Sequence, residues 1–383
     1  MTRFNYLVYF LILSSTLYGY ESRSEISLNQ FFYSSQKSET VLSGFTELKL
    51  KKSDFEALMN LEYLYSNEYS RRRYISINEL YLSKEFDDYR VDLGKQINYW
   101  GELEGYNISD IFNTKNYLND IFDSSKKLGS WALSAVKYSN EDSFEVGIKF
   151  YENDLNYPFI TDYSKHLSTE KSRWTPSLYF LYSFVTNSFL ESENKIIFWY
   201  GYDNKRYFTP INQTTVSQFA YRVKKIIFLS NIVYEDYIYK VESAYSDVID
   251  DLNIADYAQI SFGVERGLFD LSGADLNLYG EYYRYIYFGN EKIEGVDISE
   301  IYNNDIFLAF RLNFNDVESS VIESGLLYDL QSGEKVFKIK AKSRIKERFI
   351  LSSEFLSIYP AKDGFLSKLT DHRRVMVGIT YTF

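Results

Sequence analysis

Cysteine is absent from this sequence, and histidine occurs only twice in 383 residues. The absence of cysteine excludes disulfides, thiolate catalysis, cysteine-ligated metal and a lipid anchor on cysteine. His166 and His372 lie far apart in the sequence, and there is no glycine-rich phosphate loop or histidine cluster with metal-ligand spacing. We therefore expect neither an enzyme nor a bound cofactor.

Long hydrophobic runs are also missing. The longest, residues 6–13, has roughly eight residues, whereas a membrane-spanning helix needs about 20. Arg3 precedes this run and small residues follow it, an order typical of a secretory signal peptide cleaved after Gly19. A buried first strand is the alternative interpretation. We expect residues 1–19 to be a signal peptide and residues 20–383 to form a single domain.

An excess of positive charge is missing as well, because the net charge is −11. Phosphate backbones are bound by basic surfaces, so we expect no nucleic acid partner. Cationic or neutral solutes remain compatible with this charge.

Aromatic residues are abundant, with 38 Tyr and 30 Phe. Such rings favour strands, and proline, which disfavours them, occurs only four times. The last eleven residues show the pattern clearly, because apolar residues at 375, 377, 379, 381 and 383 alternate with polar or small ones. Alternation with aromatics at the end is typical of a transmembrane β-strand. This segment resembles the C-terminal signature of bacterial outer-membrane β-barrels, which implies recognition of the strand ending at Phe383 by the barrel-assembly machinery.

The rest of the chain divides into strands joined alternately by short turns and long polar segments. Residues 55–65 carry an apolar row about eleven residues long, and a tilted strand needs about 9–11 to cross a bilayer. Eight short-turn hairpins can be counted, one of them within residues 216–245 with an indistinct turn near Leu229. The isolated strands 26–33 and 373–383 must then pair with each other. We predict an all-β, antiparallel up-and-down transmembrane barrel of about 18 strands, with 16 as the alternative.

The long segments are expected on the external side of the membrane, since outer-membrane barrels place short turns in the periplasm. The third of them, residues 99–130, is too long for a simple connector and carries aromatics with which to pack. We predict that it folds into the barrel and narrows the lumen, although a solvated surface loop is the alternative. Its charged residues, the candidate constriction, are Glu102, Glu104, Asp110, Lys115, Asp120, Asp123, Lys126 and Lys127.

The phase of the strands predicts which polar side chains face the lumen, because charges facing acyl chains would cost about 2–4 kcal/mol at the midplane. These polar side chains could either select ions or simply hydrate the lumen wall, and both roles are compatible with the sequence. The candidate wall residues are Arg90, Asp92, Gln96, Glu281, Arg311, Lys338, Lys340, Lys342 and Glu354.

Residues 90–129 also carry a family resemblance. Gly94-Lys95-Gln96 runs into Trp100-Gly101 and a loop rich in Asp and Asn. This segment resembles the large outer-membrane porins and exporters of the alginate-export-like kind. The resemblance implies a passive channel with an inward third loop, but an alginate path would need a strongly basic lumen, which this acidic chain lacks.

Together these observations predict a porin-like channel in the bacterial outer membrane that passes small hydrophilic solutes, with weak cation selectivity from the acidic loop. A surface anchor or adhesin with a plugged lumen and a dedicated solute or polymer exporter are the alternatives. The expected partners are outer-membrane lipid and lipopolysaccharide, the assembly machinery and the solutes, with the protein a monomer or a homotrimer.

Overall fold

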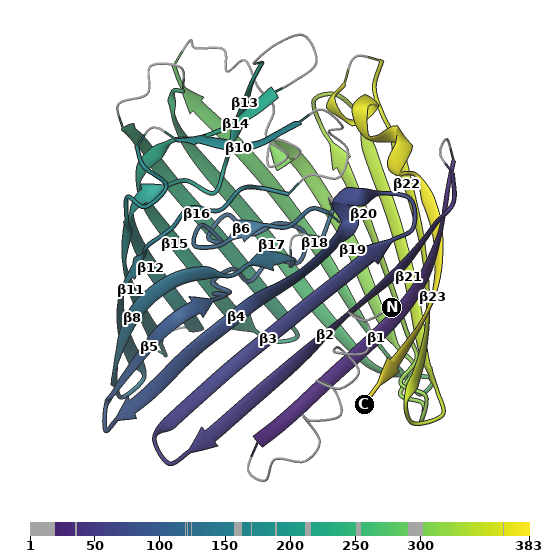
Figure 1. Cartoon of the computed structure of the whole chain (residues 1–383), viewed down its shortest axis with the longest axis horizontal. Coiled ribbons are helices and arrows are strands. Elements are labelled where there is room, and N and C mark those ends of the chain that lie inside the picture. Colours follow the sequence, from purple (N-terminus) through teal and green to yellow (C-terminus); the bar gives the residue numbers. More distant parts are fainter. Residues whose placement is uncertain are drawn as a thin grey trace, which may run out of the picture.

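The chain forms a closed antiparallel β-barrel (Figure 1). The computed structural model describes residues 20–34, 37–118, 120, 122–123, 125–156, 163–169, 171–187, 190–210, 216–249, 254–289, 302–362 and 364–383. The predicted signal peptide, residues 1–19, lies outside these. No helix in the described ranges is both long and apolar enough to cross a membrane.

Eighteen strands of the described chain make one sheet, in which each strand pairs with its neighbours in the chain. The prediction of an 18-stranded all-β barrel is therefore confirmed, and the 16-stranded alternative is wrong. The strands are β1 (Tyr20–Tyr33), β2 (Glu39–Lys52), β3 (Phe55–Ser66), β4 (Arg73–Phe86), β5 (Tyr89–Gln96), β8 (Ser130–Ser139), β9 (Asp142–Lys149), β11 (Ser177–Thr186), β12 (Glu191–Tyr202), β15 (Arg222–Tyr234), β16 (Tyr237–Ile249), β17 (Asp256–Leu271), β18 (Ala274–Phe288), β19 (Asn304–Asn313), β20 (Val321–Asp329), β21 (Lys335–Ile345), β22 (Phe349–Tyr359) and β23 (Arg374–Thr382).

The barrel closes between its first and last strands, as the hairpin count predicts. β1 pairs antiparallel with β23 from Glu25 opposite Thr382 to Tyr33 opposite Arg374. The hydroxyls of Ser27 and Thr380 are 2.8 Å apart across this seam. A closed sheet leaves no unpaired edge within the membrane, which is the condition for strands to cross lipid.

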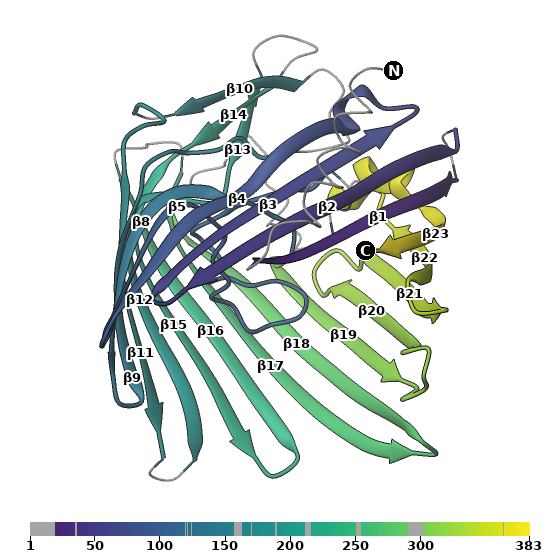
Figure 2. The ribbon, with the colours of Figure 1, turned by 60° about the horizontal axis from the view of Figure 1, so that its bottom comes forward.

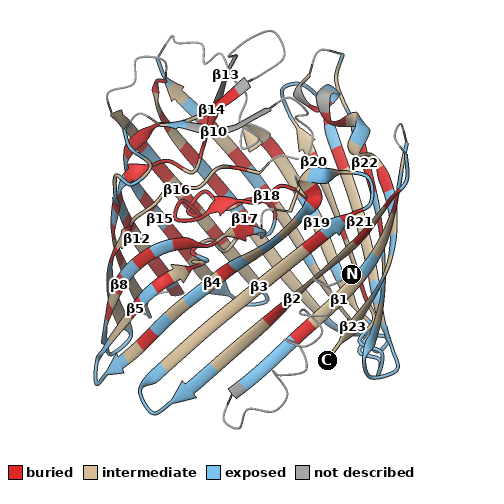
Figure 3. Ribbon diagram, viewed as in Figure 1, coloured by how far each residue is buried: buried red, intermediate tan, exposed pale blue. Residues whose placement is uncertain are grey.

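Alternation along each strand separates an outer face from an inner one. On β23, Val375, Val377 and Ile379 are exposed on the outside of the barrel, whereas Arg374 is 5% exposed on the inside. On β4, Ile75 and Ile77 are exposed and Asn78 is buried. Figure 3 shows this alternation of buried and exposed positions around the sheet. The outward apolar rows form the surface that a lipid bilayer would cover.

The short turns lie at one end of the barrel, and several need a left-handed residue. Ser53, Asp87, Asn140 and Glu235 have φ between 38° and 55° at the turns that follow β2, β4, β8 and β15. The turn expected near Leu229 is therefore wrong, because β15 continues to Tyr234 and the turn lies at Glu235. Residues 226–229 are apolar on both faces of a continuous strand, so they gave no turn signal.

The other end of the barrel carries the longer connections (Figures 1 and 2). A second sheet there consists of β10 (Tyr163–Thr169), β14 (Val216–Ala220) and β13 (Tyr207–Pro210), with β14 in the centre. Residues 216–220 thus belong to this sheet and not to the barrel strand predicted to begin at 216. The short 3-10 helices η1 (Ser70–Arg72) and η3 (Phe365–His372) follow β3 and β22.

Candidate functional site: the loop inside the barrel

The segment between β5 and β8, hereafter the inner loop (residues 97–129), lies inside the barrel (Figure 1). It contains a small two-stranded sheet, β6 (Thr114–Lys115) with β7 (Lys127–Leu128). Figure 3 shows the loop around β6 as buried. The predicted inward course of the third long connection is what the chain adopts.

Two carboxylates on the opposite wall hold the first half of the inner loop. Glu242 of β16 accepts hydrogen bonds from the backbone N–H groups of Glu102 and Ser109, both at 3.0 Å. Glu281 of β18 accepts from the N–H groups of Glu104 at 2.7 Å and Gly105 at 3.0 Å. Irregular backbone has no internal ladder, so these carboxylates satisfy donors that would otherwise be buried without partners.

Aromatic packing fixes the same half of the loop against β11 and β12. The Trp100 ring lies 5.2 Å from that of Tyr179 and 6.5 Å from that of Trp199, and Phe112 lies 5.6 Å from Tyr179. Ile111 is completely buried. The inner wall on this side therefore packs against the loop through an apolar core, where the alternation alone predicts a polar lumen.

An ion-pair cluster closes the loop on itself. Asp110 is 3.1 Å from the Nζ of Lys115 and 2.8 Å from that of Lys127, and all three are buried. Burial alone would raise the pKa of Asp110, but the two lysines hold it below the usual value. Burial lowers the pKa of Lys127 to about 8, with Asp110 opposing the shift. The cluster joins β6 and β7 to the segment that contacts Glu242.

The second half of the loop is tied to the strands next to the seam. Asp120 pairs with Lys338 of β21 and lies 3.5 Å from Arg374 of β23. Glu354 of β22 lies 2.8 Å from Arg374 and 3.7 Å from Lys338. Although burial opposes it, these cations hold the pKa of Asp120 below its usual value. The loop is thus anchored at points on opposite sides of the barrel.

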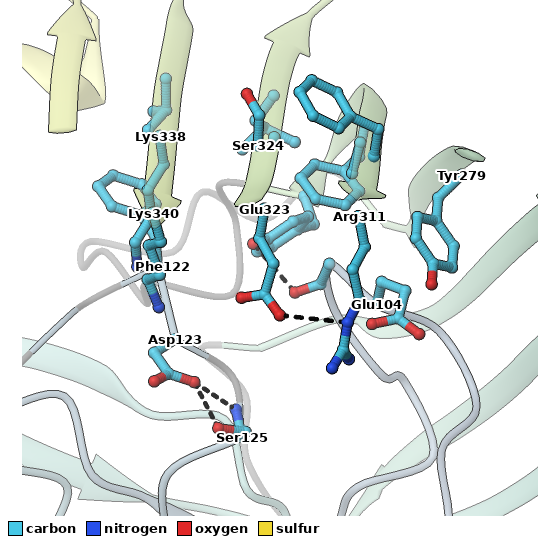
Figure 4. Close-up of a pocket in the computed structure, with 18 residues that line it drawn as sticks. Glu104, Phe122, Asp123, Ser125, Tyr279, Arg311, Glu323, Ser324, Lys338 and Lys340 are labelled. Atoms are coloured by element: carbon cyan, nitrogen blue, oxygen red, sulfur yellow. Dashed lines mark hydrogen bonds and ion pairs between the residues drawn. The ribbon is translucent and has the colours of Figure 1, made fainter. Parts of the chain in front are cut away.

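Between the inner loop and β18–β21 lies a cavity of about 280 Å³ (Figure 4). Glu104 and Asp123 reach it from the loop, and Arg311, Lys338 and Lys340 reach it from the wall. Glu323 lies between these wall cations, 3.6 Å from Arg311. The loop side of the cavity is thus acidic, whereas the wall side carries three cations and the carboxylate of Glu323.

The predicted constriction residues therefore fall into two groups. Glu104 and Asp123 border the cavity, whereas Asp110, Lys115, Asp120 and Lys127 are buried in the contacts that hold the loop. Glu102 pairs with Lys195 of β12 at 2.6 Å, and Lys126 is exposed with its carbonyl accepting from the Asn116 N–H.

The predicted wall residues also divide. Arg311, Lys338 and Lys340 line the cavity, and Lys342 is exposed beyond it. Glu281 anchors the loop, and Glu354 pairs with Arg374 and Lys338, the two cations that hold Asp120. Arg90 pairs with Asp92 at 2.9 Å on β5, and Gln96 is buried where its carbonyl accepts from Asn113. These three stand away from the cavity.

Sequence reasoning missed three residues of the site, Glu242, Glu323 and Arg374. Glu242 carried a signal, because it is an acidic residue within a strand whose neighbours Val241 and Ala244 are apolar. Arg374 lies on the polar face of the last strand and pairs there with Glu354 and with Asp120 of the inner loop.

Comparison with known proteins identifies the fold but not a family. No family model and no curated protein matches the chain. Among solved structures, OpdK of Pseudomonas aeruginosa is similar with a TM-score of 0.53 and 9% identity, covering 96% of this chain and 99% of that one. OccAB4 of Acinetobacter baumannii gives 0.57 and 10%, with coverage of 96% and 99%. Wzi of Escherichia coli, described as a carbohydrate-binding β-barrel involved in capsule assembly, gives 0.56 and 9%, with coverage of 98% and 87%.

The closed barrel, its outward apolar rows and these similarities define the class: a multi-pass β-barrel of the bacterial outer membrane. Within that class, the resemblance of residues 90–129 to the alginate-export-like porins stays a prediction. The signal peptide, the assembly-machinery contact at Phe383 and the choice between monomer and homotrimer also stay predictions.

Proposed function

We propose that this barrel is a passive channel for small hydrophilic solutes, with a lumen that the inner loop narrows. The observation that carries the proposal is the anchoring of the loop across the barrel, by Trp100 packed against Tyr179 of β11 and by Asp120 paired with Lys338 of β21. Glu242 on β16 and Glu281 on β18 hold it between these points. This anchoring leaves the cavity beside β18–β21 as the polar opening. The proposal involves no catalytic step and no cofactor.

The charges around the cavity favour weak cation selectivity. Lys338 is 16% exposed and is neutralised by Asp120 and Glu354, so it contributes little field to the opening. Glu104 and Glu323 are 50% and 40% exposed, and Asp123 is partly exposed beside them. Arg311 and Lys340, at 45% and 38%, are the two wall cations left to oppose three carboxylates.

Planar-bilayer recording tests the channel. We expect the purified, refolded protein to give stable single-channel steps, and deletion of residues 110–126 to raise their conductance. Unchanged conductance after the deletion would contradict the constriction.

A surface anchor with a plugged lumen is the second candidate, and one observation favours it. The inner loop and the wall of β11–β18 share a continuous apolar core that fills part of the interior. A barrel that inserts and folds but stays electrically silent would support this candidate and overturn the channel.

A further inference from the structure

A second cavity, separate from the opening beside β18–β21, lies on the other side of the inner loop. It measures about 410 Å³ and shares no lining residue with the first. Its walls are the segment around η1, the inner faces of β3 and β4, the inner loop and the segment that follows β9. Because η1 and that segment belong to the end with the long connections, the cavity lies on the external side of the loop. Its size falls within the range of small-molecule sites, about 300–1,000 Å³.

The charged groups of this cavity balance one another. Glu62 and Asp154 carry the negative charges, and Arg71 and Arg73 the positive ones. Asp154 is 3.3 Å from Arg173, and Arg73 donates to the carbonyls of Ser66 and Asn67 at 2.7 and 2.9 Å. A charged solute would therefore gain little net attraction on entering.

Neutral hydrogen-bonding groups supply most of the remaining polar lining. Ser70 and Ser76 bring a hydroxyl to the cavity lining and Asn156 an amide. Leu118 and Leu155 give the same cavity an apolar side. Hydroxyls and amides beside an apolar surface match a ring that carries hydroxyl groups at its edge and C–H groups on its faces.

The cavity is held in shape before any ligand arrives. Asn78 accepts from the N–H of Gly129 at 3.0 Å and donates to the carbonyl of Lys127 at 3.1 Å, which fixes the inner loop to β4. Gln218 exchanges two hydrogen bonds with the backbone of Leu155, at 2.9 and 2.7 Å. A preformed wall reduces the entropy lost on binding.

We propose that this cavity binds a neutral, polyhydroxylated solute of mono- or disaccharide size. It would act as a loading site at the mouth of the barrel, independent of whether the opening beside β18–β21 conducts.

The test is saturation-transfer NMR on the folded, detergent-solubilised protein, with maltose and sucrose as neutral probes and glutamate and lysine as charged ones. We expect saturable binding of at least one sugar and none of the amino acids. Ser76→Leu and Asn156→Leu, which fill the cavity from two different elements, should each weaken binding at least tenfold. Ser43→Leu is the matched control, because Ser43 lies on the inner face of β2 and does not line the cavity.

Three outcomes would overturn the proposal. These are no saturable sugar binding by folded wild-type protein, sugar binding by both filled variants as strong as that of the wild type, or stronger binding of a charged probe than of either sugar. Folding of every variant is checked by the shift of the unheated protein in gel electrophoresis. Conductance is recorded separately. A folded barrel that binds sugar but shows no single-channel conductance would contradict the channel proposal and support this one.

Discussion

Ser109 donates two hydrogen bonds to one carboxylate oxygen of Glu242, from its backbone N–H at 3.0 Å and from its hydroxyl at 3.1 Å, although 133 residues separate the two. The same carboxylate also accepts from the N–H of Glu102. A single side chain of the wall thus fixes two points of the inner loop.

Replacing this anchor should loosen the loop. In Glu242→Ala we expect higher mean conductance and more open-channel noise, because each buried donor left unpaired costs about 1–3 kcal/mol. Single-channel recording measures both quantities. Glu318→Ala, at an exposed position between β19 and β20, is the control and should behave as wild type. Wild-type noise in Glu242→Ala would show that the remaining anchors hold the loop without Glu242.

Asp120 and Lys338 should be energetically coupled. Asp120→Asn leaves Lys338 and Arg374 with Glu354 as their remaining partner among the described contacts, and breaking a buried ion pair costs roughly 3–5 kcal/mol. Lys338→Met should be less harmful in the Asp120→Asn background than in the wild type. Denaturant unfolding in micelles of the two single variants and the double variant gives the coupling energy. Additive effects would contradict a direct interaction.

Charge selectivity should depend on the two loop carboxylates that border the cavity. We expect the double variant Glu104→Gln, Asp123→Asn to move the reversal potential toward anions, and Arg311→Gln with Lys340→Gln to move it toward cations. Measurement is made in a salt gradient across a planar bilayer. Lys126→Gln, which alters an exposed loop residue outside the cavity, should shift it little. Equal shifts in all three would mean that ions take another path.

Acid should change selectivity before it changes conductance. Burial raises the pKa of Glu104, so this carboxylate loses its charge at a higher pH than Asp110 and Asp120 do. The pKa values of Asp110 and Asp120 lie below the usual 3.8, so their stabilising ion pairs are complete above that pH and are lost only as the pH falls through the lower values. Reversal potential and conductance are recorded from pH 7 to pH 3. A conductance rise that precedes the selectivity change would contradict this order.

Most of the barrel could be predicted from the sequence because its strands alternate between lipid and interior. Val375, Val377 and Ile379 show the outward row directly. A pattern of period two predicts a strand and not a helix, and the many aromatic residues favour the same interpretation. The inward loop could be expected from its length and its aromatic residues. Its anchors could not, because Glu242 and Ser109 are joined only by tertiary folding.

The apolar core between the inner loop and β11–β18 was not predicted, although the sequence carries a signal for it. Ile196-Ile197-Phe198-Trp199 on β12 and Ile226-Ile227-Phe228-Leu229 on β15 are apolar on both faces, as expected where lipid lies outside and packed side chains lie inside. The charged wall residues that line the cavity, Arg311, Glu323, Lys338 and Lys340, lie on β19–β21.

The pairing of β1 with β23 has a consequence for biogenesis. Ser27 and Thr380 form a contact across 353 positions of sequence. The folding sheet therefore has two edge strands with unpaired backbone groups until β23 pairs with β1. Contacts between residues so far apart in sequence slow folding. A partly folded chain therefore needs protection from aggregation until the barrel closes.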